Sequence, residues 1–136
     1  MQGIAPSASS PLYLETVSAG FPSPAQDYVE QQLDLNQLCI KRPAATYFVR
    51  VEGDSMIEAG ILAGDLLVVD RSLQPRDGDT VIACLNSEFT VKCLQTRPQR
   101  QLLPRNSRYR PIPIGDADEF EIFGVVTGVI RTLKRG

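Results

Sequence analysis

Two polar residues, Ser55 and Lys92, have the side-chain types needed to hydrolyse an amide bond. Ser55 lies in the segment VEGDSMIEAG and Lys92 in EFTVKCL. Burial disfavours the ammonium form of a lysine, so a buried lysine can accept the proton of a neighbouring serine. The sequence contains no histidine, which excludes Ser-His-Asp and Cys-His catalysis as well as HExxH metal sites. A serine–lysine pair is one of the few hydrolytic arrangements that needs no histidine.

The local sequence fits this chemistry but leaves other interpretations open. Strand alternation over residues 88–94 places Lys92 on the same face as Thr90 and Leu94, which is partly apolar. Ser55 follows the strand-like run TYFVRV, where a turn can present its hydroxyl and aim backbone N–H groups at a developing oxyanion. On spacing alone, a GDS tripeptide is usually only a turn, and a lysine in a strand usually extends into solvent.

Short β-strands are the elements that must position these residues. From residue 46 onward, apolar and β-branched runs are separated by Gly, Asp and Asn. The runs are TYFVRV, DLLVVD, TVIACL, EFTVKCL and EIFGVVTGVIRTL, and LNSE is expected to join two of them as a hairpin. Weak apolar periodicity over residues 27–38 predicts a short helix. We therefore predict a mainly β domain over residues 37–134, preceded by an extended Pro/Ser/Ala-rich arm over residues 1–36.

Composition restricts the classes of function. The chain has 136 residues, of which 43% are apolar and 22% charged, and this is typical of one folded domain. A net charge of -2 and a pI near 5.1 leave no positive field for strong direct DNA binding. No segment approaches the ~20 apolar residues that span a bilayer. The opening residues also lack a signal-peptide core, so we expect a cytoplasmic protein.

The cysteines and arginines point to no further chemistry. Cys39, Cys84 and Cys93 form no CxxC pair, and their odd number fits free thiols in a reducing compartment. Cys84 and Cys93 lie in apolar strands, where we expect them to pack as small hydrophobic side chains. We expect neither a metal nor a cofactor. The five arginines of residues 97–110 predict a solvated surface loop.

Four longer segments resemble the UmuD family and together cover most of residues 19–130. They are GFPSPAQDYVEQQLDLNQL, ATYFVRVEGDSMIEAGILAGDLLVVDRS, GDTVIACLNSEFTVKCLQ and FGVVTGVI. The UmuD family belongs with the LexA-type and phage-repressor autoproteases of the peptidase S24 group, which in turn resemble signal peptidases. The resemblance implies a small LexA/signal-peptidase-like β-barrel. It also implies that Ser55 is the nucleophile and Lys92 the general base, and that the scissile bond joins Ala19 to Gly20.

The sequence around the implied scissile bond agrees with that assignment. The small side chain of Ala19 suits a narrow pocket, and Gly20 lets the backbone approach the nucleophile closely. Val17 can occupy a second shallow pocket. Only 19 residues precede Gly20, so we expect no helix-turn-helix domain before the cleavage site, unlike in LexA-type repressors.

The resemblance also implies partners and a cellular role. In the UmuD family, RecA bound to single-stranded DNA promotes self-cleavage during the SOS response. The shortened homodimer then joins UmuC, a Y-family translesion polymerase. Two alternatives are a non-catalytic, polymerase-binding module with a vestigial peptidase fold and a repressor fragment.

Overall fold

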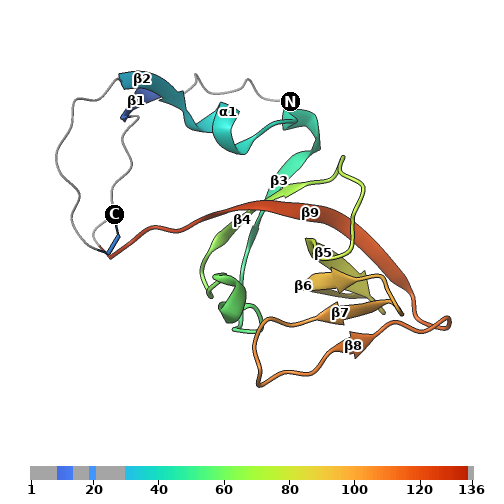
Figure 1. Ribbon diagram of the computed structural model, residues 1–136. Helices are drawn as coiled ribbons and strands as arrows, with labels where there is room; N and C mark the ends of the chain where they lie inside the picture. Colours follow the sequence, from blue (N-terminus) through green and yellow to red (C-terminus); the bar gives the residue numbers. More distant parts are fainter. Residues whose placement is uncertain (1–8, 14–18, 21–29, 135–136) are drawn as a thin grey trace. The chain divides into compact units, whose positions relative to one another are not determined.

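The computed structural model describes residues 9–13, 19–20 and 30–134 (Figure 1). These residues fall into two units, one within residues 1–41 and the other within residues 42–136. The division between residues 36 and 37 that we expected from the sequence stays a prediction. None of the described helices is long and apolar enough to cross a lipid bilayer.

The first unit contains a two-stranded antiparallel ladder and one short helix. Strand β1 (Ser9–Tyr13) pairs with β2 (Glu30–Asp34), and helix α1 (Leu35–Cys39) follows directly. Asp34 caps the helix, because its carboxylate accepts a hydrogen bond at 2.9 Å from the N–H group of Asn36. This bond satisfies one of the N–H groups that a helix leaves unpaired at its start.

The helix predicted over residues 27–38 is therefore wrong for the residues of β2, and it begins only at Leu35. The apolar periodicity there is weak, and pairing with β1 prevails over it. Residues 27–29 lie outside the described part of the chain. The arm, which we expected to be extended and without packed elements, thus contains a regular β-ladder.

The second unit is built on one seven-stranded antiparallel sheet with the order β3-β4-β9-β5-β6-β7-β8. Its strands are β3 (Thr46–Arg50), β4 (Leu66–Asp70), β5 (Thr80–Leu85), β6 (Glu88–Gln95), β7 (Gln101–Leu103), β8 (Ile112–Pro113) and β9 (Phe120–Ile130). Short 3-10 helices η1 (Pro43–Ala45) and η2 (Ile57–Ala59) precede and follow β3. The predicted mainly β fold is confirmed.

The sheet is open, whereas the family resemblance implied a barrel. Strands β3 and β8 are its two edges in the described part of the chain. Strand β9 crosses the middle of the unit as a long curved ribbon (Figure 1), and its register shifts once against β4 and once against β5. Such bulges bend a strand and increase its twist, so β9 curves the sheet without closing it.

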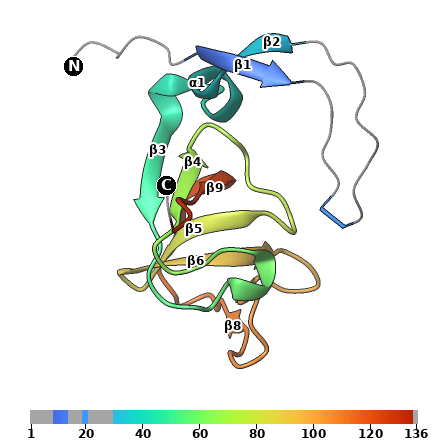
Figure 2. The same cartoon turned by 90° about the vertical axis from the view of Figure 1, so that its left-hand side faces the viewer.

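Two apolar clusters form the core. The first comprises Val51, Met56, Ile61, Leu67, Val69, Ile82 and Cys93, and the second comprises Val81, Ala83, Leu94, Leu102, Ile114 and Val125. Neighbouring residues of β5 and β6 therefore enter different clusters, because successive side chains of a strand point to opposite faces. Figure 2 shows β5 and β6 lying side by side. Residues 81–83 of β5 and 92–94 of β6 are buried, so a lysine at this point of the sheet is largely removed from water.

The LNSE hairpin is confirmed. Leu85 pairs with Glu88 across a two-residue turn, and the central residues Asn86 and Ser87 have φ values of 50° and 71°. Positive φ at both central positions gives a turn whose twist matches that of the flanking strands. This turn fixes the register of β6 against β5, and with it the position of Lys92.

The segment over residues 97–110 is more than a solvated loop. It contains strand β7, whose Leu102 is fully buried, and Asn106 is only 4% exposed. The arginines of the segment correctly predicted that much of it is exposed. They gave no sign that Leu102 and Asn106 are buried.

A buried ion pair joins the residue after β9 to the loop before β4. Arg131 donates from Nε and Nη2 to the two carboxylate oxygens of Asp65, each at 2.7 Å, and Asp65 is 1% exposed. The same guanidinium donates to the Gly60 carbonyl, and the Leu62 N–H group donates to Asp65, both at 2.7 Å. The hydrogen bonds from Arg131 and then Leu62 lower the pKa of Asp65 to about 2.

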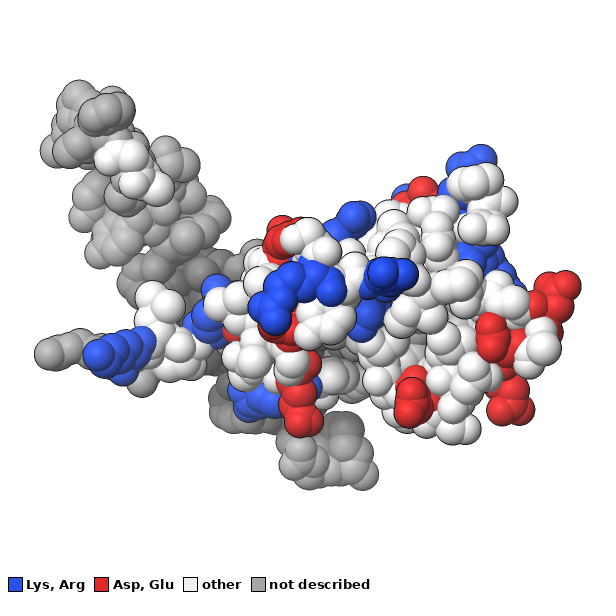
Figure 3. All heavy atoms as spheres, turned by 90° about the horizontal axis from the view of Figure 1, so that it is seen from below, with Lys and Arg blue, Asp and Glu red and all other residues white. Residues whose placement is uncertain are grey.

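Charged side chains are mixed on the face seen from below. Figure 3 shows acidic side chains at one end of this face and also near its middle, with lysines and arginines among them. The described residues on this face therefore carry no continuous basic surface.

We predict that Gly124→Ala destabilises the fold. A Cβ atom at this position would lie 2.5 Å from Val69 Cγ1 and 3.3 Å from the Asp70 carbonyl oxygen, and Val69 is fully buried. Overpacking of this kind should lower the free energy of unfolding by about 1–3 kcal/mol in chemical denaturation. Gly128→Ala is the matched control on β9, because its nearest contact would be an ordinary 3.5 Å. Equal losses in the two variants would contradict the steric explanation.

Candidate active site

Lys92 is the one lysine among the described residues that is buried. It lies on β6 opposite Val81 of β5 and is 9% exposed. Its Nζ donates hydrogen bonds to Ser55 Oγ at 3.1 Å, to the Val91 carbonyl oxygen at 3.2 Å, and to Thr90 Oγ1. Desolvation lowers the pKa of Lys92 below its ordinary value of 10.5, because burial disfavours the ammonium form.

The structure thus brings Ser55 and Lys92 together. The strand alternation predicted for residues 88–94 is also supported, because Thr90 and Lys92 share a hydrogen bond. When Nζ is neutral it has a free lone pair, and at 3.1 Å from Oγ it can take the hydroxyl proton. Such an arrangement can generate an alkoxide-like nucleophile without histidine.

The turn that presents Ser55 follows β3 and begins at Gly53. The φ of Gly53 is +79°, a left-handed conformation that favours glycine. The segment after β7 is hydrogen-bonded to this turn. The Arg105 N–H group donates to the Ser55 carbonyl at 2.7 Å, and Asn106 Nδ2 donates to the Asp54 carbonyl at 2.8 Å.

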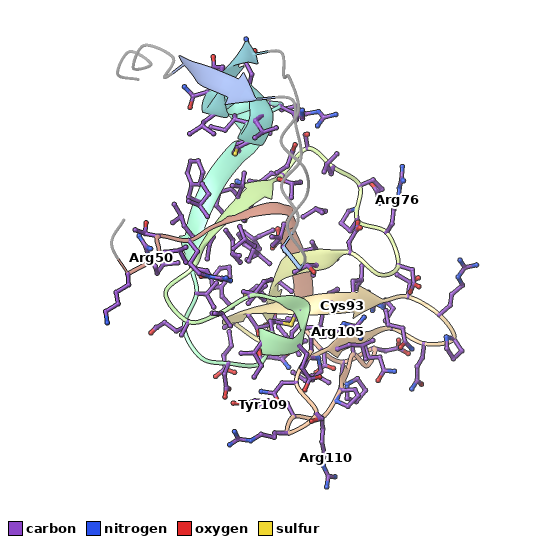
Figure 4. The ribbon with its side chains drawn as sticks, turned by 60° about the vertical axis from the view of Figure 1, so that its left-hand side comes forward. Arg50, Arg76, Cys93, Arg105, Tyr109 and Arg110 are labelled. Atoms are coloured by element: carbon purple, nitrogen blue, oxygen red, sulfur yellow. The ribbon has the colours of Figure 1, made fainter. Side chains whose placement is uncertain are left out.

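Sequence reasoning missed this supporting segment. It contains no periodic apolar pattern, and its residues touch Ser55 only through contacts between positions about fifty residues apart in the chain. A second anchor comes from the core: Arg105 Nη2 donates to Cys93 Sγ at 3.0 Å, and the two side chains lie next to each other in Figure 4. Cys93 itself is 3% exposed and packs in the first apolar cluster, as its strand context predicted.

A cleft of about 340 Å³ opens beside Ser55 and Lys92. It is lined by β3 and the residues after it (Val49, Arg50, Val51, Glu52), by β6 (Phe89, Thr90, Val91, Lys92) and by Ser55, Leu67 and Ile82. Its lining mixes apolar with polar and charged side chains, and Phe89 is 63% exposed. A cleft with such a mixed lining beside Ser55 is a candidate binding site.

The remaining predicted site residues belong to the first unit. Ala19 and Gly20 form an exposed bend, and a Cβ atom built on Gly20 would meet no heavy atom within 4 Å. Val17 lies outside the described residues. Across the described ranges, no group of three or more cysteine, aspartate and glutamate side chains is placed to hold a metal ion.

Comparison with known proteins assigns the chain to a family. The Peptidase S24-like family matches residues 11–127. The chain is 54% identical over 127 residues to protein SamA of Salmonella typhimurium, which covers 93% of this chain and 89% of SamA. It is 51% identical over 120 residues to protein MucA of Escherichia coli, covering 88% and 82% of the two chains. It is also 42% identical over 118 residues to the LexA repressor of Bordetella pertussis, covering 85% of this chain and 54% of the repressor. The chain therefore belongs to the peptidase S24-like family of serine peptidases.

Proposed function

We propose that this chain is a self-cleaving serine peptidase in which Ser55 is the nucleophile, Lys92 is the general base, and the scissile bond joins Ala19 to Gly20. The observation that carries the proposal is the 3.1 Å hydrogen bond between a buried Lys92 Nζ and Ser55 Oγ. A solvated lysine would stay protonated at neutral pH. Burial lowers the pKa of Lys92, which is the direction that a general base needs.

The reaction begins when neutral Lys92 takes the Ser55 hydroxyl proton and Oγ attacks the Ala19 carbonyl carbon. The tetrahedral intermediate collapses as the Lys92 ammonium returns that proton to the Gly20 nitrogen, which leaves as a free amine. Ala19 is then held as an ester on Ser55. Lys92 next takes a proton from water, the hydroxide attacks the ester, and Ser55 regains its proton from Lys92.

The cellular role follows from the resemblance to the UmuD family. We infer that RecA on single-stranded DNA stimulates this cleavage in the SOS response, by favouring the arrangement in which the scissile bond reaches Ser55. The processed homodimer then acts as an accessory subunit of a UmuC-type translesion polymerase. The extensive similarity to SamA and MucA, over most of each chain, supports this role.

We predict that Ser55→Ala abolishes self-cleavage, because no oxygen remains to attack the Ala19 carbonyl. The rate should fall by roughly 10³-fold or more, while the fold is retained. Intact mass is measured after incubation with RecA filaments on single-stranded DNA and a nucleotide, with circular dichroism as the control. A Ser55→Ala chain that still begins at Gly20 would exclude Ser55. An intact wild-type chain, there and at alkaline pH, would favour the non-catalytic polymerase-binding module.

We predict that Ala19→Trp blocks cleavage in the full chain, because an indole does not fit a pocket shaped for a small side chain. Ala19→Ser is the matched control and should be processed at a rate close to that of the wild type. Supplying an active second copy should not rescue the Trp variant. The check is N-terminal sequencing of the products, and normal processing of Ala19→Trp would place the scissile bond elsewhere.

We predict that cleavage without an activator accelerates as pH rises and then levels off. Only neutral Lys92 accepts a proton, and burial lowers its pKa, so the midpoint should lie below the ordinary 10.5. Lys92→Arg should be inactive at every pH, because a guanidinium stays protonated. Lys41→Arg, at an exposed position, is the control. A flat wild-type pH profile, or a folded and active Lys92→Arg chain, would remove Lys92 from the mechanism.

A further inference from the structure

A buried side-chain amide lies behind the Ser55 turn and has no part in the proton transfer described above. Asn106 is 4% exposed, and its Nδ2 donates to the Asp54 carbonyl oxygen at 2.8 Å. Its Oδ1 accepts a hydrogen bond from the Arg108 N–H group at 3.0 Å. These two bonds fix the orientation of the amide, because exchanging its oxygen and nitrogen would break both of them.

The bond to Asp54 has a geometric consequence for Ser55. The Asp54 carbonyl and the Ser55 N–H group belong to one planar trans peptide, so they point in opposite directions. Holding the Asp54 carbonyl therefore also fixes the direction of the Ser55 N–H group. Among the described residues, nothing accepts a hydrogen bond from the Ser55 N–H group, and it is free to bind an oxyanion.

Two neighbours of Asn106 in the chain, Arg105 and Tyr109, also contact this turn. The Arg105 N–H group holds the Ser55 carbonyl at 2.7 Å. The Tyr109 hydroxyl donates to the Asp54 carboxylate, and this hydrogen bond raises the pKa of Tyr109. Figure 4 shows Arg105 and Tyr109 projecting from this one segment of the chain. The turn is thus held at the carbonyls of both Asp54 and Ser55 and at the Asp54 side chain.

We propose that Asn106 is a positioning residue that aims the Ser55 N–H group at the oxyanion of the tetrahedral intermediate. The assignment rests on the proposed function, since it concerns the same nucleophile. Asn106 makes no hydrogen bond to Lys92, so it acts on the oxyanion donor and leaves the burial of the base unchanged. The contacts that orient the Ser55 N–H group are therefore distinct from those that bury Lys92.

The test uses full-length chains carrying Asn106→Asp or Asn106→Ala, with self-cleavage rates measured across the pH profile. Asn106→Asp keeps an oxygen for the Arg108 N–H group but loses the donor to the Asp54 carbonyl. The rate on the alkaline plateau should fall roughly tenfold or more in both variants, short of the ~10²–10³ typical of deleting an oxyanion donor outright. The midpoint of the pH profile should stay at its wild-type value.

Two further variants serve as references. Ser107→Ala is the control, because its exposed side chain is removed while its backbone N–H group still donates to Glu58. Tyr109→Phe removes only the exposed contact to the Asp54 side chain, and it should cause a smaller loss of plateau rate than Asn106→Asp does. Because Tyr109 is exposed, this variant should fold, and a plateau loss as large as that of whichever Asn106 variant folds would contradict the assignment to Asn106.

Three outcomes would overturn the assignment. The first is a plateau rate like that of the wild type in folded Asn106→Asp, while wild-type cleavage depends on Ser55; this removes the role of Asn106 alone. The second is a loss of rate accompanied by a rise in the pH midpoint, which would mean that the variant merely lets water reach Lys92. The third is wild-type cleavage that does not depend on Ser55, which would overturn the proposed function as well.

Discussion

The loss of water around the Lys92 ammonium group is the constraint on which the rest of the site depends. Burial of a cation is unfavourable unless acceptors replace the water, and three oxygens do so: those of Thr90, Val91 and Ser55. Two of them come from β6 itself, so most of the compensation is local. The third comes from the proposed nucleophile, so in the proposed mechanism the hydroxyl that stabilises the protonated Lys92 is also the group that neutral Lys92 deprotonates.

This constraint is met where the sheet is buried on both faces. A lysine on a strand with one solvated face would extend its amine into water and keep its ordinary pKa. Here β5 and β6 lie between two apolar clusters, and Lys92 is only 9% exposed. The proposed nucleophile, by contrast, lies on a turn outside the sheet. Its position depends on the segment after β7, which donates hydrogen bonds to the Asp54 and Ser55 carbonyls.

The sequence predicted the parts of the molecule that follow a local rule. The five apolar runs form five of the seven strands of the central sheet, and the Asn86–Ser87 turn forms where its residues favour it. The prediction failed where tertiary pairing decides the outcome. Glu30–Asp34 has a composition that suits a helix, but it pairs as a strand. Asn106 looks like an ordinary loop residue, and only contacts to the distant Asp54 reveal its position in the site. The pairing of Ser55 with Lys92 came from family resemblance, since spacing alone left it open.

The ion pair between Arg131 and Asp65 has a consequence for how the molecule opens. Strand ends near a chain terminus usually fray, because few contacts hold them. If the end of β9 were to detach, the Asp65 carboxylate would remain buried without its cation, and a buried unpaired charge is strongly unfavourable. Detachment would therefore break the contacts of the Arg131 guanidinium to Asp65 and to the Gly60 carbonyl together. We expect amide hydrogen exchange at the end of β9 to be linked to exchange in that loop, although the two segments lie far apart in the chain.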